Sequence, residues 1–195
     1  MSALPEHRIT PEEYLAIERA AEYKSWYYDG RMYPMDGQEQ GMAGASFKHG
    51  LIIANLAAEL TLALRKGPCV VVTNDLKVRV APGGLYTYPD IVVACDKIEF
   101  ADEREDTLLN PILLIEVLSK STEAIDRVFK SAQYRQLASL KEYALVSQTE
   151  AHIEMYRRRP DGWVLSDYVG LDATCPFESV GCGIGLTDVY SKVTF

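Results

Sequence analysis

Apolar side chains recur at helical intervals in two long segments of the chain. In residues 47–64 they stand three or four positions apart. The same period runs through residues 121–139, where Ser121 or Thr122 can cap a helix and Glu123 lies in its first turn. An amphipathic helix is therefore expected in each segment. The apolar positions of the first are Leu51, Ile52, Leu56, Leu60 and Leu64.

The N-terminal part of the chain predicts a shorter helix followed by a hairpin. Thr10 can act as the N-cap, Pro11 suits the first helical position, and Glu13 stands three residues after the cap. This helix should end near residue 21. Aromatic and polar residues then alternate over residues 25–35 around an Asp-Gly pair, which is typical of two short antiparallel strands joined by a tight turn.

Runs of β-branched residues occupy the middle of the chain. Those from Cys69 to Val80 and from Tyr88 to Cys95 are separated by a Pro-Gly turn and should pair as antiparallel strands. A third run, residues 111–118, has no polar alternation, so it should lie at the centre of a sheet with both faces covered. Three further strands are expected at residues 143–148, 151–158 and 163–170, with a turn between the last two.

The order of these elements predicts an α/β fold of the mixed α+β kind. The helix after the third β-branched run should cross over a central mixed sheet, which is flanked by helices and preceded by the N-terminal helix and hairpin. With 195 residues and 48% hydrophobic content, the chain can close one core. We find no internal repeat or linker and expect a single domain over residues 1–195.

Composition and charge narrow the possible functions. The net charge of −8 argues against general attraction to nucleic acid, so any such contact must use local basic patches. No 18-residue apolar stretch is expected to span a membrane, and the N-terminal residues are charged where a signal peptide would be apolar. These features predict a cytoplasmic protein.

The four cysteines are scattered and show no CxxC spacing. Neither a disulfide framework nor a zinc cluster is expected from such a distribution. The positions are Cys69, Cys95, Cys175 and Cys182.

Two acids interrupt the apolar strands. Asp90 follows Pro89 at the start of IVVA, and Glu116 lies within PILLIEVL. Burying a carboxylate in an apolar strand is costly unless a cation or hydrogen-bond donors compensate it. Adjacent strands lie about 4.8 Å apart, so two such carboxylates at matching height can share one ion. Taken singly, each acid is more often a turn residue or part of an ion pair.

Together with their flanks, these residues resemble the PD-(D/E)xK nuclease superfamily and, within it, the Uma-type family of restriction endonucleases of unknown substrate. The resemblance implies a restriction-endonuclease-like fold and phosphodiester hydrolysis with Mg²⁺ or Mn²⁺. It also implies that Asp90 and Glu116 bind the metal together with the carbonyl of Val117. The matching segments are DGRMYPM, GASFKHGLIIANL, NDLKVRV, TYPDIVVACD, DTLLNPILLIEVLSKSTEAIDR, YRQLASLKEYALVSQ and GLDAT.

The chain departs from the superfamily pattern two residues after the glutamate, where Leu118 replaces the motif's lysine. Similarity to the Uma-type pattern implies that the following helix supplies the lysine, as Lys130. Asp126, Lys130 and Tyr134 are spaced by four and share one helical face. Lys130 would then orient the attacking water and offset charge at the phosphate. Lys120 is a poorer candidate for this role, because it follows the strand too closely for its side chain to turn back easily to the site.

Three further residues are auxiliary candidates: His49, Asp75 and Asp126. His49 matches a family position at the start of the second helix, where it either contacts a phosphate or a water or is structural. Asp75 is either a second carboxylate near the metal or part of a strand irregularity, and we favour the structural interpretation.

Trp26 stands where many relatives have a glutamate, and an indole cannot bind a hard cation. If that glutamate belongs to the active site, this chain cleaves its substrate slowly, uses Glu22 instead, or has lost cleavage activity.

Our main hypothesis is a Mg²⁺-dependent endonuclease acting on nucleic acid, preferably DNA, as a homodimer that reaches both strands. The alternative is a binding or regulatory module that keeps the nuclease fold without activity. A small-molecule phosphate or nucleotide hydrolase is a third possibility without a sequence signal of its own. The aromatic hairpin around Trp26 is either a dimer interface or a lid on the core. The arginines at 157–159 are solvated or contact phosphate.

Overall fold

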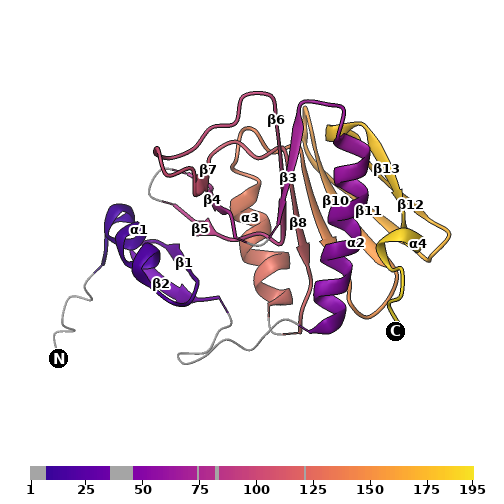
Figure 1. The fold of residues 1–195 in the computed structure, drawn as a ribbon, viewed down its shortest axis with the longest axis horizontal. Coiled ribbons are helices and arrows are strands. Elements are labelled where there is room, and N and C mark those ends of the chain that lie inside the picture. Colours follow the sequence, from indigo (N-terminus) through magenta and orange to yellow (C-terminus); the bar gives the residue numbers. More distant parts are fainter. Residues whose placement is uncertain (1–7, 36–45, 74, 82–83, 121) are drawn as a thin grey trace.

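The computed structural model describes residues 8–35, 46–73, 75–81, 84–120 and 122–195. A six-stranded sheet in the order β11-β10-β9-β8-β6-β3 forms its centre (Figure 1). β8 runs parallel to β9, and the other neighbours in this sheet are antiparallel. The strands are β3 (Cys69–Thr73), β6 (Ile91–Cys95), β8 (Leu113–Val117), β9 (Glu142–Val146), β10 (His152–Arg159) and β11 (Gly162–Val169).

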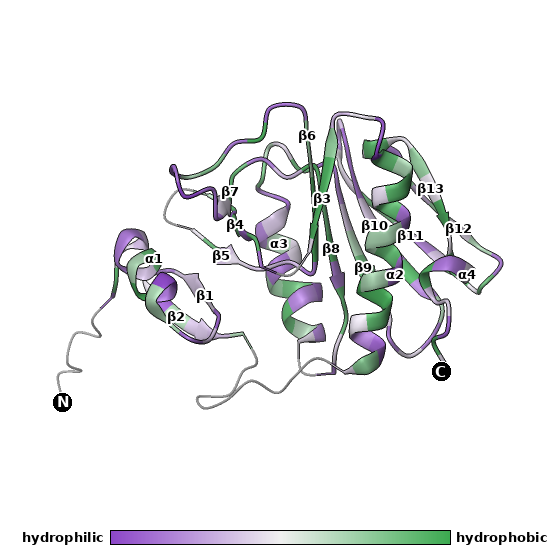
Figure 2. Cartoon of the chain, viewed as in Figure 1, coloured by the Kyte–Doolittle hydropathy of each residue, from purple (hydrophilic) through white to green (hydrophobic). Residues whose placement is uncertain are grey.

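Helix α2 (Phe47–Leu64) covers one face of this sheet. Ser46 caps the helix by accepting a hydrogen bond from the backbone of His49 at 3.2 Å. Its apolar positions pack with Ile115 and Val117 of β8 in one core cluster, as the helical spacing predicted. Figure 2 shows hydrophobic residues along α2 and the strands beside it. The buried residues of α2 are Ile52, Ile53, Leu56, Leu60 and Leu64.

By length and composition alone, α2 is also apolar enough to cross a membrane. One helix of this kind is weak evidence of a membrane span. The physical reason is that a core helix with many Leu, Ile and Ala residues passes the same test. In this structure the buried side of α2 packs on the sheet.

The opposite face of the sheet is covered by the crossover segment between β8 and β9 (Figure 1). This segment begins with a π-helical stretch, η1 (Ile125–Lys130), and continues as the short α3 (Ser131–Tyr134). The sequence predicted one regular helix that ends near residue 139. The observed helical segment is shorter, and its first part is a π-helix. Leu114 and Leu118 pack on this side with Tyr134. The expected caps included Ser121, which lies outside the described residues, as does the Pro82-Gly83 turn.

A second sheet, in the order β2-β1-β5-β4-β7, joins the N-terminal elements to the middle of the chain. The predicted capping box of α1 is present, with Thr10 and Glu13 bonded reciprocally. Asp29 and Gly30 both adopt positive φ, as a tight hairpin turn requires. The elements are α1 (Pro11–Ala20), β1 (Ser25–Tyr28), β2 (Arg31–Pro34), β4 (Lys77–Arg79), β5 (Tyr86–Thr87) and β7 (Thr107–Leu108).

Two sequence-based expectations are corrected in this region. The run from Cys69 to Val80 is not one strand, because β3 joins the large sheet and β4 the second sheet. Cys69 and Cys95 form a disulfide, although none was expected. They are directly paired neighbours on β3 and β6, a proximity that their separation in sequence did not reveal. Cys175 and Cys182 are free thiols.

The C-terminal elements pack beside α2 (Figure 1). They form a small two-stranded sheet and two short helical turns. Buried side chains from this region, including Phe177 and Leu186, extend the core cluster beneath α2. The elements are β12 (Thr174–Phe177), η2 (Glu178–Val180), β13 (Cys182–Gly185) and α4 (Leu186–Val189).

The mixed sheet flanked by helices confirms the predicted fold class. Because β8 is central and its five residues are all buried, it can place a charged side chain in a protected environment.

Candidate metal centre

The two acids that interrupt the apolar strands meet in the structure. Ile91 of β6 pairs with Ile115 of β8 in an antiparallel ladder, so the register continued by one residue sets Asp90 opposite Glu116. Asp90 Oδ2 accepts a hydrogen bond from the backbone N–H of Val117 at 2.7 Å. The side chain of Asp90 is 18% exposed, and Glu116 is buried. One acid therefore lies at the edge of the core and the other within it.

The crossover segment brings a cation to this pair. Lys130 Nζ lies 3.0 Å from Oε1 of Glu116 and 2.8 Å from Oδ1 of Asp126. Asp126 and Lys130 are both buried, and they stand four positions apart on η1. The structure thus brings together four of the residues that the sequence proposed, namely Asp90, Glu116, Asp126 and Lys130. Their catalytic role stays a prediction.

Tyr134 is a member of the site to which sequence reasoning assigned no role. Its hydroxyl donates to Oε1 of Glu116 at 2.8 Å, and its side chain is fully buried. The available signal was its spacing, because it stands four positions after Lys130 on the same face. That spacing shows which side of a helix a residue occupies and cannot show which group it will contact.

His49 reaches Asp90 from the opposite side of the sheet. Its Nε2 lies 3.2 Å from Asp90 Oδ2, while its Nδ1 is buried and finds no partner among the described residues. Burial lowers the pKa of His49, but the hydrogen bond and charge of Asp90 outweigh this, so the pKa lies above its usual value. The charged form of His49 is therefore stabilised beside the carboxylate.

A hydrogen-bonded chain ties the start of α2 to the end of β8. Ser46 Oγ donates to Gln148 at 2.7 Å, and the Gln148 amide donates to the carbonyl of Leu118 at 2.5 Å. Since Ser46 caps α2, this chain fixes the turn that carries His49.

Three acids and two basic groups make up the cluster. Glu116 and Asp126 contact the ammonium of Lys130, and Asp90 contacts His49. Burial raises the pKa of Glu116 strongly, and the charges of the other two acids raise it further against the opposing effect of Lys130. Burial lowers the pKa of Lys130, but the charges of Glu116 and Asp126 reverse this and raise it. Lys130 therefore stays charged.

The oxygen ligands of this cluster fit a divalent cation. Mg²⁺ and Mn²⁺ prefer carboxylate and carbonyl oxygens and retain water in the remaining positions. Oε2 of Glu116 forms no hydrogen bond within the described part of the chain, so it is available as a ligand. Asp90 is the second carboxylate at the same edge of the sheet.

The structure does not bring two other candidates to the cluster. The carboxylate of Asp75 pairs with Lys24, and its side chain is 80% exposed. Glu22, the expected substitute for the missing glutamate, is exposed just after α1. Neither residue contacts Asp90 or Glu116 among the described interactions.

Trp26 is a packing residue in the hairpin. Its ring stacks on Tyr33 at a centroid distance of 4.1 Å and contacts Phe129 at 5.5 Å. Tyr28 contacts the same phenylalanine at 4.9 Å. Because Phe129 immediately precedes Lys130, these contacts pack the hairpin against the segment that carries the lysine. They favour the interpretation of the hairpin as a lid on the core.

The arginines at 157–159 make contacts within the chain. Arg157, expected to be solvated, is buried and pairs with Glu142 at 2.8 Å. Arg158 donates to main-chain carbonyls that include that of Leu140, and Arg159 pairs with Glu178. The physical reason for the correction is that alternate positions of β10 face the core.

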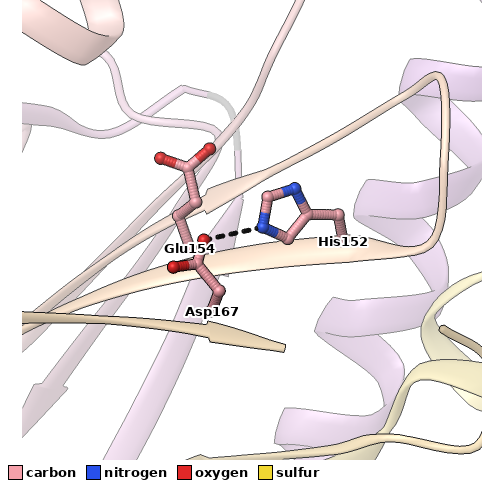
Figure 3. A group of neighbouring side chains, drawn as sticks. All are labelled: His152, Glu154 and Asp167. Atoms are coloured by element: carbon pink, nitrogen blue, oxygen red, sulfur yellow. Dashed lines mark hydrogen bonds and ion pairs between the residues drawn. The ribbon is translucent and has the colours of Figure 1, made fainter. Parts of the chain in front are cut away.

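A separate group of possible metal ligands lies on β10 and β11: His152, Glu154 and Asp167 (Figure 3). Their ligand atoms all lie within 4.8 Å of one another. His152 Nε2 is 2.9 Å from Asp167 Oδ1, and Glu154 forms an ion pair with Arg127. Arg127 thus already compensates the charge of Glu154. The sequence did not reveal this group, which depends on the register that sets Glu154 opposite Asp167.

Comparisons with known proteins agree with this arrangement. A family model named Uma2, with the description "Putative restriction endonuclease", matches residues 11–187. Uncharacterized protein slr1290 of Synechocystis sp. (strain ATCC 27184 / PCC 6803 / Kazusa) is 33% identical over 194 residues, which cover 98% of this chain and 96% of that protein. Uncharacterized protein sll1609 of the same organism is 31% identical over 171 residues, covering 87% and 93%.

A solved structure shares the fold. It is titled "Crystal structure of a putative nuclease belonging to DUF820 from Anabaena variabilis ATCC 29413 at 1.96 A resolution". The match has a TM-score of 0.74 at 20% identity and covers 95% of this chain and 99% of that one. At this identity the likeness concerns the fold.

Proposed function

This chain belongs to the family Uma2, whose description is "Putative restriction endonuclease", and we propose that it hydrolyses phosphodiester bonds of nucleic acid with the help of a divalent cation. The observation that supports this most directly is the buried contact of Lys130 with Glu116, opposite Asp90. Two carboxylates and a lysine in this arrangement match the requirements of phosphodiester cleavage.

Asp90 and Glu116, with the carbonyl of Val117, are the proposed ligands of Mg²⁺ or Mn²⁺. When bound, such a cation stabilises negative charge on the phosphate oxygens and lowers the pKa of a bound water. The backbone N–H of Val117 holds Asp90 in place for this task.

Lys130 acts on the attacking water and the phosphate. Its ammonium can orient the water and offset the charge that develops on the phosphate oxygens. Asp126 holds this ammonium 2.8 Å away, which keeps Lys130 protonated and aimed at Glu116. His49, which lies 3.2 Å from Asp90, is positioned to contact a phosphate oxygen or a water at the edge of the site.

We propose DNA as the substrate and the cytoplasm as the location. A second copy would supply the second active site for cleaving both strands of a duplex. The rings of the N-terminal hairpin pack within the chain, so a dimer would use other surfaces. Gel filtration at a mass near 21.8 kDa would contradict the dimer.

The second candidate function is a binding module that keeps the fold without cleavage. Trp26 supports it, because a packed indole occupies the hairpin position at which the family resemblance implies a glutamate. The acidic net charge of −8 supports it as well. Under this alternative Lys130 serves only as the counterion of Glu116 and Asp126.

Cleavage assays on the purified full chain test the main proposal. We expect single-stranded, double-stranded or structured nucleic acid to be cut only with Mg²⁺ or Mn²⁺. Asp90→Ala and Lys130→Ala should abolish cutting, while Asp75→Ala, which removes an exposed acid outside the cluster, should not. Absence of cleavage across the whole panel would refute the catalytic claim.

Calorimetric titration with Mn²⁺ separates the two candidates. Binding that is lost in Glu116→Ala supports the metal centre, whereas no binding by the wild-type chain favours the module.

A further inference from the structure

Both hydrogen bonds to Glu116 reach the same carboxylate oxygen. Lys130 Nζ lies 3.0 Å from Oε1, and the Tyr134 hydroxyl donates to Oε1 at 2.8 Å. Oε2 has no hydrogen-bond partner among the described residues. One oxygen of Glu116 is thus held by two donors, and the other keeps its lone pairs for another ligand.

Tyr134 is well suited to hold that oxygen. Its side chain is fully buried on α3, and its ring packs edge-on against Tyr143 at 5.0 Å. A phenol hydroxyl has one proton to donate, and here it points at Oε1. Because the ring cannot turn away without opening the core, the direction of this hydrogen bond is set by packing.

We infer that Tyr134 is a positioning residue for Glu116: with Lys130 it holds Oε1, so that Oε2 is left to bind the divalent cation. This inference rests on the proposed function, since it gives a task to a proposed metal ligand. A carboxylate that is already oriented loses little freedom when the ion binds. Hydrogen-bonded partners of metal ligands typically contribute roughly 10- to 100-fold to metal affinity.

The test compares Mn²⁺ affinity in two matched tyrosine variants of the full chain. Tyr134→Phe removes only the hydroxyl that touches Glu116. Tyr14→Phe is the control, because Tyr14 is also fully buried and donates at 2.8 Å, but to the backbone carbonyl of Ser25. We expect calorimetry to show Mn²⁺ binding weakened about tenfold or more in Tyr134→Phe and unchanged in Tyr14→Phe. Urea unfolding should show similar losses of stability in both.

The outcomes separate this inference from the proposed function. If Tyr134→Phe binds Mn²⁺ as tightly as wild type, while Glu116→Ala has lost binding, the metal centre stands and the role of Tyr134 is overturned. If the wild-type chain itself binds no Mn²⁺, both are overturned.

A second measurement needs no variant. A wild-type crystal soaked in Mn²⁺ should show the anomalous peak beside Oε2 of Glu116 with the Tyr134 hydrogen bond intact. A peak on Oε1 with Tyr134 displaced would overturn the inference.

Discussion

Lys130 Nζ lies 3.0 Å from Oε1 of Glu116, which joins a crossover segment on one face of the sheet to the central strand, 14 positions away in sequence. Asp126 holds the same ammonium from the other side at 2.8 Å. A single lysine therefore compensates two buried carboxylates. This relationship sets the expectations for what happens when the lysine is removed.

Lys130→Met should destabilise the fold, because it leaves Glu116 and Asp126 buried without their cation. Removing one partner of a buried ion pair typically costs about 3–5 kcal/mol in the free energy of unfolding. Urea unfolding measures this loss, and added Mn²⁺ should recover part of it. The control is Lys97→Met, since Lys97 is 87% exposed and should change stability by no more than about 0.5 kcal/mol. Equal effects of the two variants would contradict the prediction.

Arg157→Gln should be strongly destabilising and should not act through nucleic acid. Arg157 is buried, and its pair with Glu142 is 2.8 Å long, so the variant removes the cation that pairs with a buried carboxylate. The expected loss is about 3–5 kcal/mol. Arg159→Gln tests the specificity of the effect, because its pair with Glu178 is about half exposed and should contribute at most about 1 kcal/mol. A stable Arg157→Gln protein that had lost only DNA affinity would revive the phosphate-contact interpretation.

Low pH should weaken the ion pair that links Arg19 of α1 to Asp106. The hydrogen bonds from Arg19 lower the pKa of Asp106 from 3.8 to about 2. Because the folded pKa lies below the unfolded one, the pair stabilises the fold above about pH 4, and this contribution is lost as the pH falls towards 2. Urea midpoints measured from pH 6 to pH 2 should therefore fall more steeply for wild type than for Asp106→Asn.

The matched control for this experiment is Asp161→Asn, an exposed acid in the β10–β11 turn. It should retain the pH dependence of wild type. A parallel fall in the wild-type and Asp106→Asn proteins would count against the proposed linkage.

Trp26→Ala should loosen the hairpin from the segment that carries Lys130. The variant removes the stack on Tyr33 and the contact with Phe129, and aromatic pairs of this kind contribute about 0.5–1.5 kcal/mol each beyond the burial of area. Tyr23→Ala, at 62% exposure, is the control and should be nearly neutral. Thermal unfolding followed by circular dichroism measures both. If Trp26→Ala melts like wild type, the indole does not stabilise the hairpin.

Local patterns in the sequence were sufficient to predict many of the regular helices, strands and turns. The cap at Thr10, the Asp29-Gly30 turn and the apolar stripe of residues 47–64 each depend on groups a few positions apart, and each is present. The buried strand around Glu116 could also be predicted, since an apolar stretch without polar alternation is the pattern of a strand covered on both faces.

The same reasoning failed where the outcome depended on distant partners. The π-helical winding of η1, the division of one β-branched run between two sheets and the Cys69–Cys95 disulfide all follow from tertiary contacts. The burial of Arg157 is a further case, because its partner lies on a neighbouring strand. No local propensity encodes which strands become neighbours.

The sequence by itself determined that one acid would open an apolar strand, that another would stand within the next, and that a lysine would follow on a helix, because strand and helix periods are properties of adjacent residues. Only the tertiary structure decided that Asp90 faces Glu116, that Lys130 and Tyr134 share one oxygen of that glutamate, and that Asp75 and Glu22 stay outside. The reason is physical. Sheet register and helix placement result from burying the whole core at once, and the low-polarity interior that they create gives each of these charges its effect.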